Sequence, residues 1–227
     1  MAWQSEYYKI TIKLTAEMLG TVPKSRSIWT NWVVGKSRKK MLKEGKTEQE
    51  IDAKVAEELP DIAEADDSEV GHTTFFQDEK GYYLQAYQVR GFLKETARIL
   101  GEYDGIKQLN SKVTKYLHVL PAKIRIAPPG ELEVCERPLR GQTPQGPRVC
   151  IARSDCVPAG TEIVFYVESL EGVLTVELLF TLLDYGRRQG LMQWRSGGRG
   201  SFDIVSIEEC DAPFPPQTLK SVLIKKK

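Results

Sequence analysis

Residues 162–207 read EIVFYVESLEGVLTVELLFTLLDYGRRQGLMQWRSGGRGSFDIVSI, and this stretch decides the fold prediction. Apolar residues alternate with other residues over positions 162–168, which predicts a strand. Residues 173–185 form an apolar run of helical length, and Gly186 is typical of a helix end. Alternation returns over residues 202–207 and predicts another strand. Strand, helix and strand in this order form one half of a ferredoxin-like unit.

The first part of the chain supplies the other half of such a unit. Residues 7–14 alternate with period two, and every second position from Tyr8 to Leu14 is apolar, which predicts a half-buried strand. Residues 88–100 are amphipathic with helical period, and Gly101 predicts the end of that helix. The fold class we predict is α+β, with a modified ferredoxin-like (RRM-like) core.

The segment between these two elements is strongly charged. Residues 36–46 are basic and residues 48–69 are acidic. We interpret residues 24–72 as a helical, charged insertion in a core formed by residues 1–23 and 73–212, with residues 213–227 as a C-terminal arm. The insertion is either a solvated helical hairpin or a lobe that contacts a partner, and the sequence leaves both open.

Shorter elements complete the predicted core. Residues 73–84 indicate a hairpin with its turn at 78–81, and a weaker helix covers residues 106–116. Short strands are expected at 119–120, 124–126, 133–135 and 148–152. The long connection from 136 to 148 contains prolines, glycines and three arginines, so we expect an arginine-rich β-hairpin with a long flexible tip.

Composition narrows the class of protein. The chain has 227 residues, 41% hydrophobic and 28% charged, which is enough to bury a core without disulfides or metal. The start of the chain has no apolar signal-peptide core, and no stretch reaches the ~18 apolar residues of a membrane helix. We therefore expect a cytoplasmic protein with no membrane partner. The net charge of +1 conceals a cationic second half.

The cysteines and histidines do not form a metal-binding pattern. Cys135, Cys150, Cys156 and Cys210 contain no CxxC pair, and only two histidines occur. Because structural zinc needs clustered ligands, we expect no metal and no cofactor. Free thiols are the favoured interpretation. Pairing among Cys135, Cys150 and Cys156 in an oxidising setting remains open.

A glycine- and arginine-rich segment joins the predicted helix 173–185 to the last strand. Residues 184–202 contain five glycines and four arginines, with no acidic residue between Asp184 and Phe202. Glycine lets backbone approach a phosphate, arginine binds phosphate with two donors, and Trp194 is suited to stack on a base. The segment lacks the GK[ST] ending of a Walker loop and the strand placement of a dinucleotide fingerprint. A flexible loop with solvated arginines is the alternative.

Two further segments carry positive charge. Residues 136–148 contain Arg137, Arg140 and Arg148. Residues 88–98 begin a helix, where Arg90 and Lys94 are suited to meet a phosphate near the positive end of the helix dipole. An ordinary hairpin tip and an ordinary surface helix are the respective alternatives.

These three segments, in this order and spacing, resemble the RAMP superfamily of CRISPR-associated proteins. Residues 88–97 are similar to the helix start written PGSSLKGALR in that superfamily. Residues 137–161, which end in VPAGT, resemble the arginine-rich hairpin of backbone subunits of type III effector complexes. Residues 186–202 are similar to the C-terminal glycine-rich loop. The chain differs where serines are usual, since Tyr87, Gln88 and Val89 stand there. The chain also looks like phage-encoded proteins.

The resemblance implies RNA binding and head-to-tail stacking. The expected partners are single-stranded, guide-like RNA, further copies of the chain in a homo-oligomer, or other CRISPR-type subunits. In the superfamily the glycine loop and the arginine hairpin face RNA. Carried over residue by residue, the RNA-binding set is Arg90, Lys94, Arg137, Arg140, Arg148, Arg187, Arg188, Trp194, Arg195, Gly197, Gly198, Arg199 and Gly200.

We favour binding without catalysis and predict no catalytic residue. A histidine-based ribonuclease needs a base near the 2′-hydroxyl, and His72 and His118 do not converge in the sequence. The acidic residues near Asp61 do not match the aspartate loop of type III subunits. An endoribonuclease of the RAMP type is one alternative. A phage protein that imitates a backbone subunit to interfere with host defence is another.

Overall fold

The computed structural model describes residues 4–24, 71–128, 130–143 and 146–213, and all structural statements concern these ranges. The larger elements are β1 (Ser5–Leu14), α3 (Ala86–Leu100), α4 (Leu109–Tyr116), β7 (Leu117–Leu120), β9 (Glu133–Thr143), β10 (Gly146–Val157), β11 (Glu162–Leu170), α5 (Val176–Asp184) and β12 (Phe202–Cys210). The short strands are β2 (Met18–Leu19), β3 (Val22–Pro23), β4 (His72–Thr74), β5 (Phe76–Asp78), β6 (Gly81–Gln85) and β8 (Lys123–Arg125).

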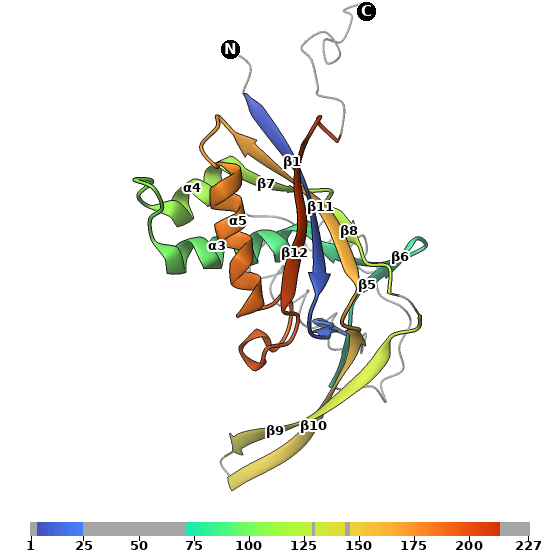
Figure 1. Cartoon of the computed structure of the whole chain (residues 1–227). Coiled ribbons are helices and arrows are strands. Elements are labelled where there is room, and N and C mark those ends of the chain that lie inside the picture. The colour runs from blue at the N-terminus through green and yellow to red at the C-terminus, as the bar shows by residue number, and fades with distance from the viewer. Residues whose placement is uncertain (1–3, 25–70, 129, 144–145, 214–227) are drawn as a thin grey trace, which may run out of the picture.

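The main sheet has the strand order β12-β1-β11-β7, and each neighbouring pair is antiparallel. Strands β1 and β7 therefore run parallel with β11 between them, and β11 and β12 run parallel with β1 between them. α3 lies in sequence between β1 and β7, and α5 lies between β11 and β12. This arrangement of two interleaved β-α-β halves is α+β and compatible with a ferredoxin-like core. Helices α3, α4 and α5 lie on one side of the sheet (Figure 1).

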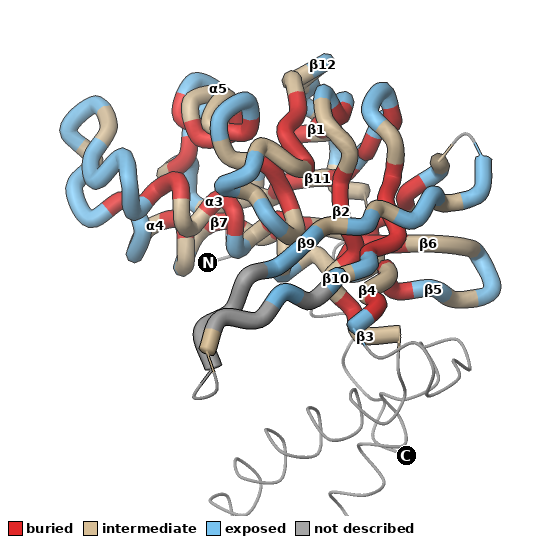
Figure 2. Tube along the Cα trace, turned by 90° about the horizontal axis from the view of Figure 1, so that it is seen from below, coloured by how far each residue is buried: buried red, intermediate tan, exposed pale blue. Residues whose placement is uncertain are grey.

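The alternation predicted for the first strand is confirmed. Tyr8, Ile10, Ile12 and Leu14 are all buried, as are the apolar residues of β11 on the same face of the sheet. The apolar side of α3 covers this face, and the Phe92 ring meets the Phe202 ring edge-on at 5.5 Å between centroids. Buried side chains therefore concentrate between helices and sheet (Figure 2). Each large one contributes roughly 1.5–3 kcal/mol to stability.

Helix boundaries differ from the sequence prediction by up to three residues. Helix α5 begins at Val176 rather than at residue 173, because the Thr175 hydroxyl accepts from the Leu178 amide and caps the helix there. It ends at Asp184, and a 3₁₀ turn over Tyr185–Arg187 follows. Helix α4 begins at Leu109, three residues later than expected. The end of α3 at Leu100 with Gly101 as cap is confirmed.

The hairpin expected over residues 73–84 is divided between two sheets. β4 pairs in parallel with β10. β5 instead pairs with β6, and β6 pairs on its other side with β8. The turn at residues 78–81 is confirmed, and the Asp78 carboxylate there binds the Arg125 guanidinium and Lys123. These bonds hold the pKa of Asp78 well below its usual range, with the Arg125 hydrogen bond as the main cause.

The connection expected to be flexible over residues 136–148 is paired strand at residues 136–143 and 146–148. β9 and β10 remain in register from Cys156 opposite Glu133 to Gly146 opposite Thr143. The two strands form a long hairpin that extends away from the main sheet (Figure 1). The prolines and glycines do not prevent this backbone pairing. Pro138 lies on β9, which pairs only with β10, and an edge strand of this kind tolerates a residue without an N–H donor.

The ends of the predicted insertion leave from adjacent points. The Lys24 amide donates to the His72 carbonyl at 2.9 Å. Residues 25–70 themselves, and residues 214–227 of the predicted arm, lie outside the described ranges. Within the described ranges, no helix has the length and apolar content required to cross a membrane.

Candidate nucleic-acid interface

A half-exposed indole joins the hairpin to the glycine-rich loop. Arg137 on β9 lies over the Trp194 ring, with its guanidinium carbon 4.9 Å from the ring centroid. Arg199 approaches the same ring at 5.8 Å. Trp194 remains 45% exposed. The structure therefore brings together three of the predicted RNA-binding residues from two segments that are distant in sequence.

Polar contacts dock the loop onto the base of the hairpin. Gln193 forms a β-bridge with Leu19, and its side-chain oxygen accepts from the Ser154 hydroxyl of β10 at 3.1 Å. Thr73 lies beside the same oxygen at 3.5 Å and bonds to Ser154 at 2.8 Å. Because Ser154 is buried, this contact fixes the position of the loop next to Trp194.

Four glycines of the loop, Gly186, Gly190, Gly197 and Gly200, are closely packed, which argues against the alternative of a freely flexible loop. A Cβ at Gly186 would overlap the Phe202 ring, and one at Gly190 would overlap the Gly200 backbone. Gly200 has φ +70°, accepts from the Leu191 amide at 2.9 Å and donates to the Glu17 carbonyl at 2.8 Å. Gly197 lies directly against the Trp194 indole. These glycines allow close backbone packing and left-handed turns.

A carboxylate lies beside each of the four loop arginines. Arg195 bonds to Glu95 of α3 at 2.6 Å, and Arg199 bonds to Glu17, which follows β1. Arg187 bonds to Asp203 at 2.8 Å, and Arg188 lies 3.6 Å from Asp184. Glu17 and Glu95 come from other parts of the chain, so the sequence of the loop, which contains no acidic residue after Asp184, gave no sign of them.

These ion pairs leave donors for a further anion. A guanidinium has five N–H donors, and one carboxylate uses one or two. The Arg187 and Arg188 side chains are 62% and 70% exposed, and pairs so exposed contribute only about 0–1 kcal/mol. Arg137 has a buried Nε for which the described residues provide no hydrogen-bond partner. A phosphate can therefore join or replace the carboxylates.

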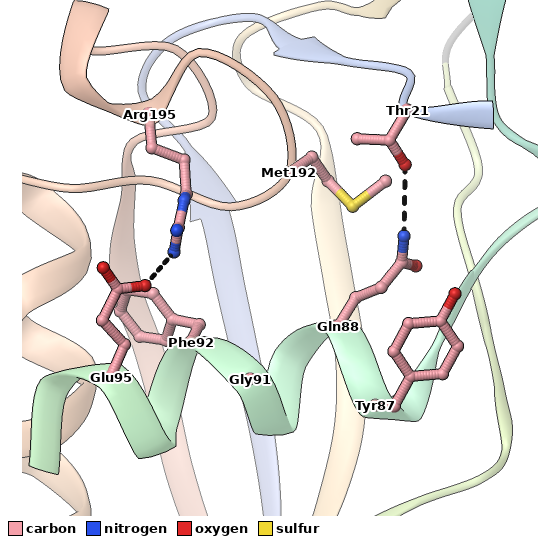
Figure 3. Close-up of a pocket in the computed structure, with 8 residues that line it drawn as sticks. All are labelled: Thr21, Tyr87, Gln88, Gly91, Phe92, Glu95, Met192 and Arg195. Atoms are coloured by element: carbon pink, nitrogen blue, oxygen red, sulfur yellow. Dashed lines mark hydrogen bonds and ion pairs between the residues drawn. The ribbon is translucent and has the colours of Figure 1, made fainter. Parts of the chain in front are cut away.

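A pocket of about 340 Å³ lies between the loop and the first turns of α3. Figure 3 shows Arg195 and Met192 above the helix and Tyr87 at its beginning. The Gln88 side chain caps the helix by accepting from the Gln85 amide at 2.8 Å and donates to Thr21 at 3.3 Å. Gly91 has open space where a Cβ would stand, so its lack of a side chain leaves this side of the pocket free.

The remaining predicted residues lie elsewhere. Arg90 donates to the Thr114 carbonyl of α4 at 2.6 Å, and Lys94 lies one turn further along the same side of α3. Arg90 thus contacts α4 rather than the glycine loop. Arg140 and Arg148 lie on the hairpin, on β9 and β10, and nothing is described of their side chains. Gly198, with φ +78°, ends the 3₁₀ turn that follows Trp194.

Comparisons with known proteins add little. No family model matches the chain, and no curated protein matches it. One solved structure that is similar is a chain from the cryo-EM structure of the Type III-B Cmr-beta bound to cognate target RNA, with 11% identity and a TM-score of 0.48. The similarity covers 91% of this chain and 61% of the other, so this chain spans less than two thirds of that neighbour's length. Similarity at this level does not assign a function.

The histidines stand apart from the interface chemistry. His72 is buried, and its Nε2 lies 2.6 Å from a carboxylate oxygen of Asp155, which joins β4 to β10. His118 lies on β7, at the far side of the main sheet from β12. Within the described residues, no group of three or more His, Cys, Asp or Glu side chains could hold a metal ion.

Some interface residues were not found from the sequence. Glu17 and Thr21 contact the loop or line the pocket but belong to no motif, whereas Glu95 and Met192 lie within the helix-start and glycine-loop segments but were assigned no role. Tyr87 and Gln88 were noted only as departures from the serines of the superfamily. The one available sequence signal was the aromatic residue directly before the predicted helix, Tyr87, which the structure places in the first turn of α3.

Proposed function

We propose that this chain binds single-stranded RNA on the surface where the glycine-rich loop, the base of the β9–β10 hairpin and the start of α3 meet. The observation that carries the proposal is the Trp194 indole flanked by the guanidinium groups of Arg137 and Arg199. The resemblance to the RAMP superfamily, found in the same loop and hairpin, supports RNA as the polyanion.

An indole between guanidinium groups suits a nucleotide of a single strand. Stacking of a base on an aromatic ring contributes about 1–3 kcal/mol and requires an unstacked base, which single strands provide. Guanidinium groups close to the ring suit contacts with the phosphates of the bound nucleotide. Such contacts position the strand without selecting its sequence.

The pocket along α3 offers a place for the adjoining nucleotide. It combines an aromatic ring, a carboxamide, a hydroxyl and the Arg195–Glu95 pair, and its volume falls within the range of ordinary ligand sites. Arg195, which lines the pocket, directly follows Trp194 in the chain, so the pocket adjoins the indole.

Assembly of several copies along one RNA is part of the same proposal. Val149 and Ile151 are exposed on the same face of β10, and Val134 of β9 is exposed as well. An apolar stripe on a projecting hairpin is typical of a protein interface. The expected result is that sedimentation mass increases by whole copies as RNA is lengthened.

The test is fluorescence anisotropy with a labelled single-stranded RNA. The same sequence as DNA and as an RNA duplex provides the comparison. The proposal predicts tightest binding to single-stranded RNA, and a weaker complex for Trp194→Ala. Phe180→Ala, which removes another exposed aromatic ring on α5, is the matched control and should bind as the unmodified chain does. Equal loss in both variants, or no loss in either, would contradict it.

A further inference from the structure

Two cysteines meet at the base of the hairpin. Cys135 lies on β9 and Cys156 on β10, and their sulfur atoms are 2.7 Å apart. The register places Cys135 opposite Ser154 and Cys156 opposite Glu133, so the two cysteines are diagonal neighbours on one face of the hairpin. This distance is shorter than the usual contact between two unbonded sulfur atoms. The sulfur atoms would have to move only slightly to reach the S–S bond length of about 2.05 Å in a disulfide.

The two thiols differ in access. Cys135 is half-buried, whereas Cys156 is 2% exposed. The Cys135 sulfur also lies 3.7 Å from the Glu17 carboxylate that binds Arg199. A reagent in solution can therefore reach Cys135 first. Cys156 lies behind Cys135, and the two sulfur atoms are in contact.

We infer that Cys135 and Cys156 are a dithiol pair that closes into an intramolecular disulfide on reaction with a low-molecular-weight disulfide such as oxidised glutathione. The Cys135 thiolate attacks one sulfur of the reagent, and one glutathione thiolate leaves. The Cys156 thiolate then attacks the Cys135 sulfur, and the second glutathione leaves. Two thiols are oxidised, the reagent is reduced to two thiols, and the two protons are carried by the glutathione released.

The environment of Cys156 sets the pH dependence of closure. Burial, with the hydrogen bond to Cys135, raises the pKa of the Cys156 thiol to about 12. Below that pKa the thiolate fraction increases about tenfold per pH unit, so the second step accelerates as pH rises. The negative charges of Glu133, opposite Cys156 on β9, and of Asp155, next to it on β10, add to the increase.

The link would fix the base of the hairpin beside the proposed RNA site. It joins the strands two residues from Arg137 and removes the thiol hydrogen that faces Glu17. Formation of the disulfide does not depend on RNA binding, so the two proposals succeed or fail separately.

The experiment uses the full chain with Cys150→Ser and Cys210→Ser, which removes the other two thiols. The reduced protein is treated with oxidised glutathione at increasing pH, alkylated and measured by intact mass and peptide mapping. The expected product has lost the mass of two hydrogen atoms and contains a linked 135–156 peptide pair, with faster closure at higher pH and full reversal by a phosphine.

Two variants test the order of events. Cys156→Ser in this background should stop at a stable glutathione adduct on Cys135, and Cys135→Ser should leave Cys156 unreacted. A persistent glutathione adduct in the chain that retains both cysteines, or full alkylation of both thiols at the highest pH, overturns the inference. The unmodified chain, mapped in the same way, shows whether the serine background alters the outcome.

Discussion

The guanidinium of Arg137 lies over the indole of Trp194, at 4.9 Å from the ring centroid. This contact joins the β9–β10 hairpin to the glycine-rich loop, which are separate segments of the sequence. A partly exposed cation–π pair contributes about 0.5–1 kcal/mol, so the pair also helps to hold the loop against the hairpin. The predictions below treat it as the centre of an RNA-binding surface.

Replacement of Trp194 by alanine should weaken RNA binding. The lost stacking free energy of about 1–3 kcal/mol corresponds to roughly a 5- to 150-fold higher dissociation constant. Anisotropy titration at fixed salt measures it, and the Phe180→Ala variant should remain within error of the unmodified chain. An unchanged constant for Trp194→Ala would falsify stacking on this ring.

Replacement of Arg199 by alanine should flatten the salt dependence of RNA affinity. Each lost phosphate contact reduces the slope of log affinity against log salt by about 0.7 for single strands. Arg98→Ala, which removes the same charge from an exposed position on α3, is the control and should leave the slope unchanged. Equal slopes for both variants would count against the loop as a phosphate site.

Neutralising Glu17 or Glu95 should strengthen RNA binding. Each carboxylate occupies an arginine of the interface, so Glu17→Gln and Glu95→Gln release donors and remove a like charge from the path of the phosphates. We expect lower dissociation constants and a steeper salt slope in both variants. Glu209→Gln, on the exposed part of β12, is the control for net charge alone. Weaker binding in both variants, with unchanged melting temperatures, would contradict the proposed site.

Two glycine substitutions should shift stability in opposite directions. A Cβ at Gly186 overlaps the Phe202 ring, so Gly186→Ala should cost about 1–3 kcal/mol of unfolding free energy. Gly91 lies within α3 with open space around it, so Gly91→Ala should add about 0.5–1 kcal/mol. Thermal melts should show a lower midpoint for the first and a higher one for the second, by about 2–4 °C per kcal/mol. A neutral Gly186→Ala would show that the packing around Phe202 is loose.

The Asp78–Arg125 pair should give stability that is lost in acid. Because the folded-state pKa of Asp78 lies below its unfolded value, the carboxylate stabilises the fold above the unfolded pKa of about 3.9. That contribution disappears as pH falls through the folded-state value. Melting curves of the unmodified chain and of Asp78→Asn should therefore differ at neutral pH and converge in strong acid. A difference that grows on acidification would contradict this account.

The sequence predicted the core better than the interface. Alternation in β1 and β11 and the apolar face of α3 depend on local period, which the sequence displays directly. The split of residues 73–84 between two sheets depends on β10, which is distant in sequence, so local patterns gave no sign of it. A hairpin was expected here, but its paired strands extend further than predicted, because backbone pairing outweighed the prolines and glycines of the expected flexible tip.

The composition of the glycine loop indicated a cationic surface but not its geometry. Arg137 and Trp194 were both predicted, yet only the folded chain places them in contact. The acidic partners of Arg195 and Arg199 come from α3 and from the end of β1, where nothing in the sequence distinguishes Glu95 or Glu17 from other surface acids.

Ultraviolet cross-linking of bound single-stranded RNA, followed by mass spectrometry of the peptides, tests the central claim most directly. Aromatic rings stacked on bases react most readily, so the account predicts nucleotide adducts on Trp194 and, at the neighbouring pocket, on Tyr87. Adducts confined to Tyr103 and Phe180, which line a separate pocket between α5 and β12, with the Trp194 peptide unmodified, would contradict it.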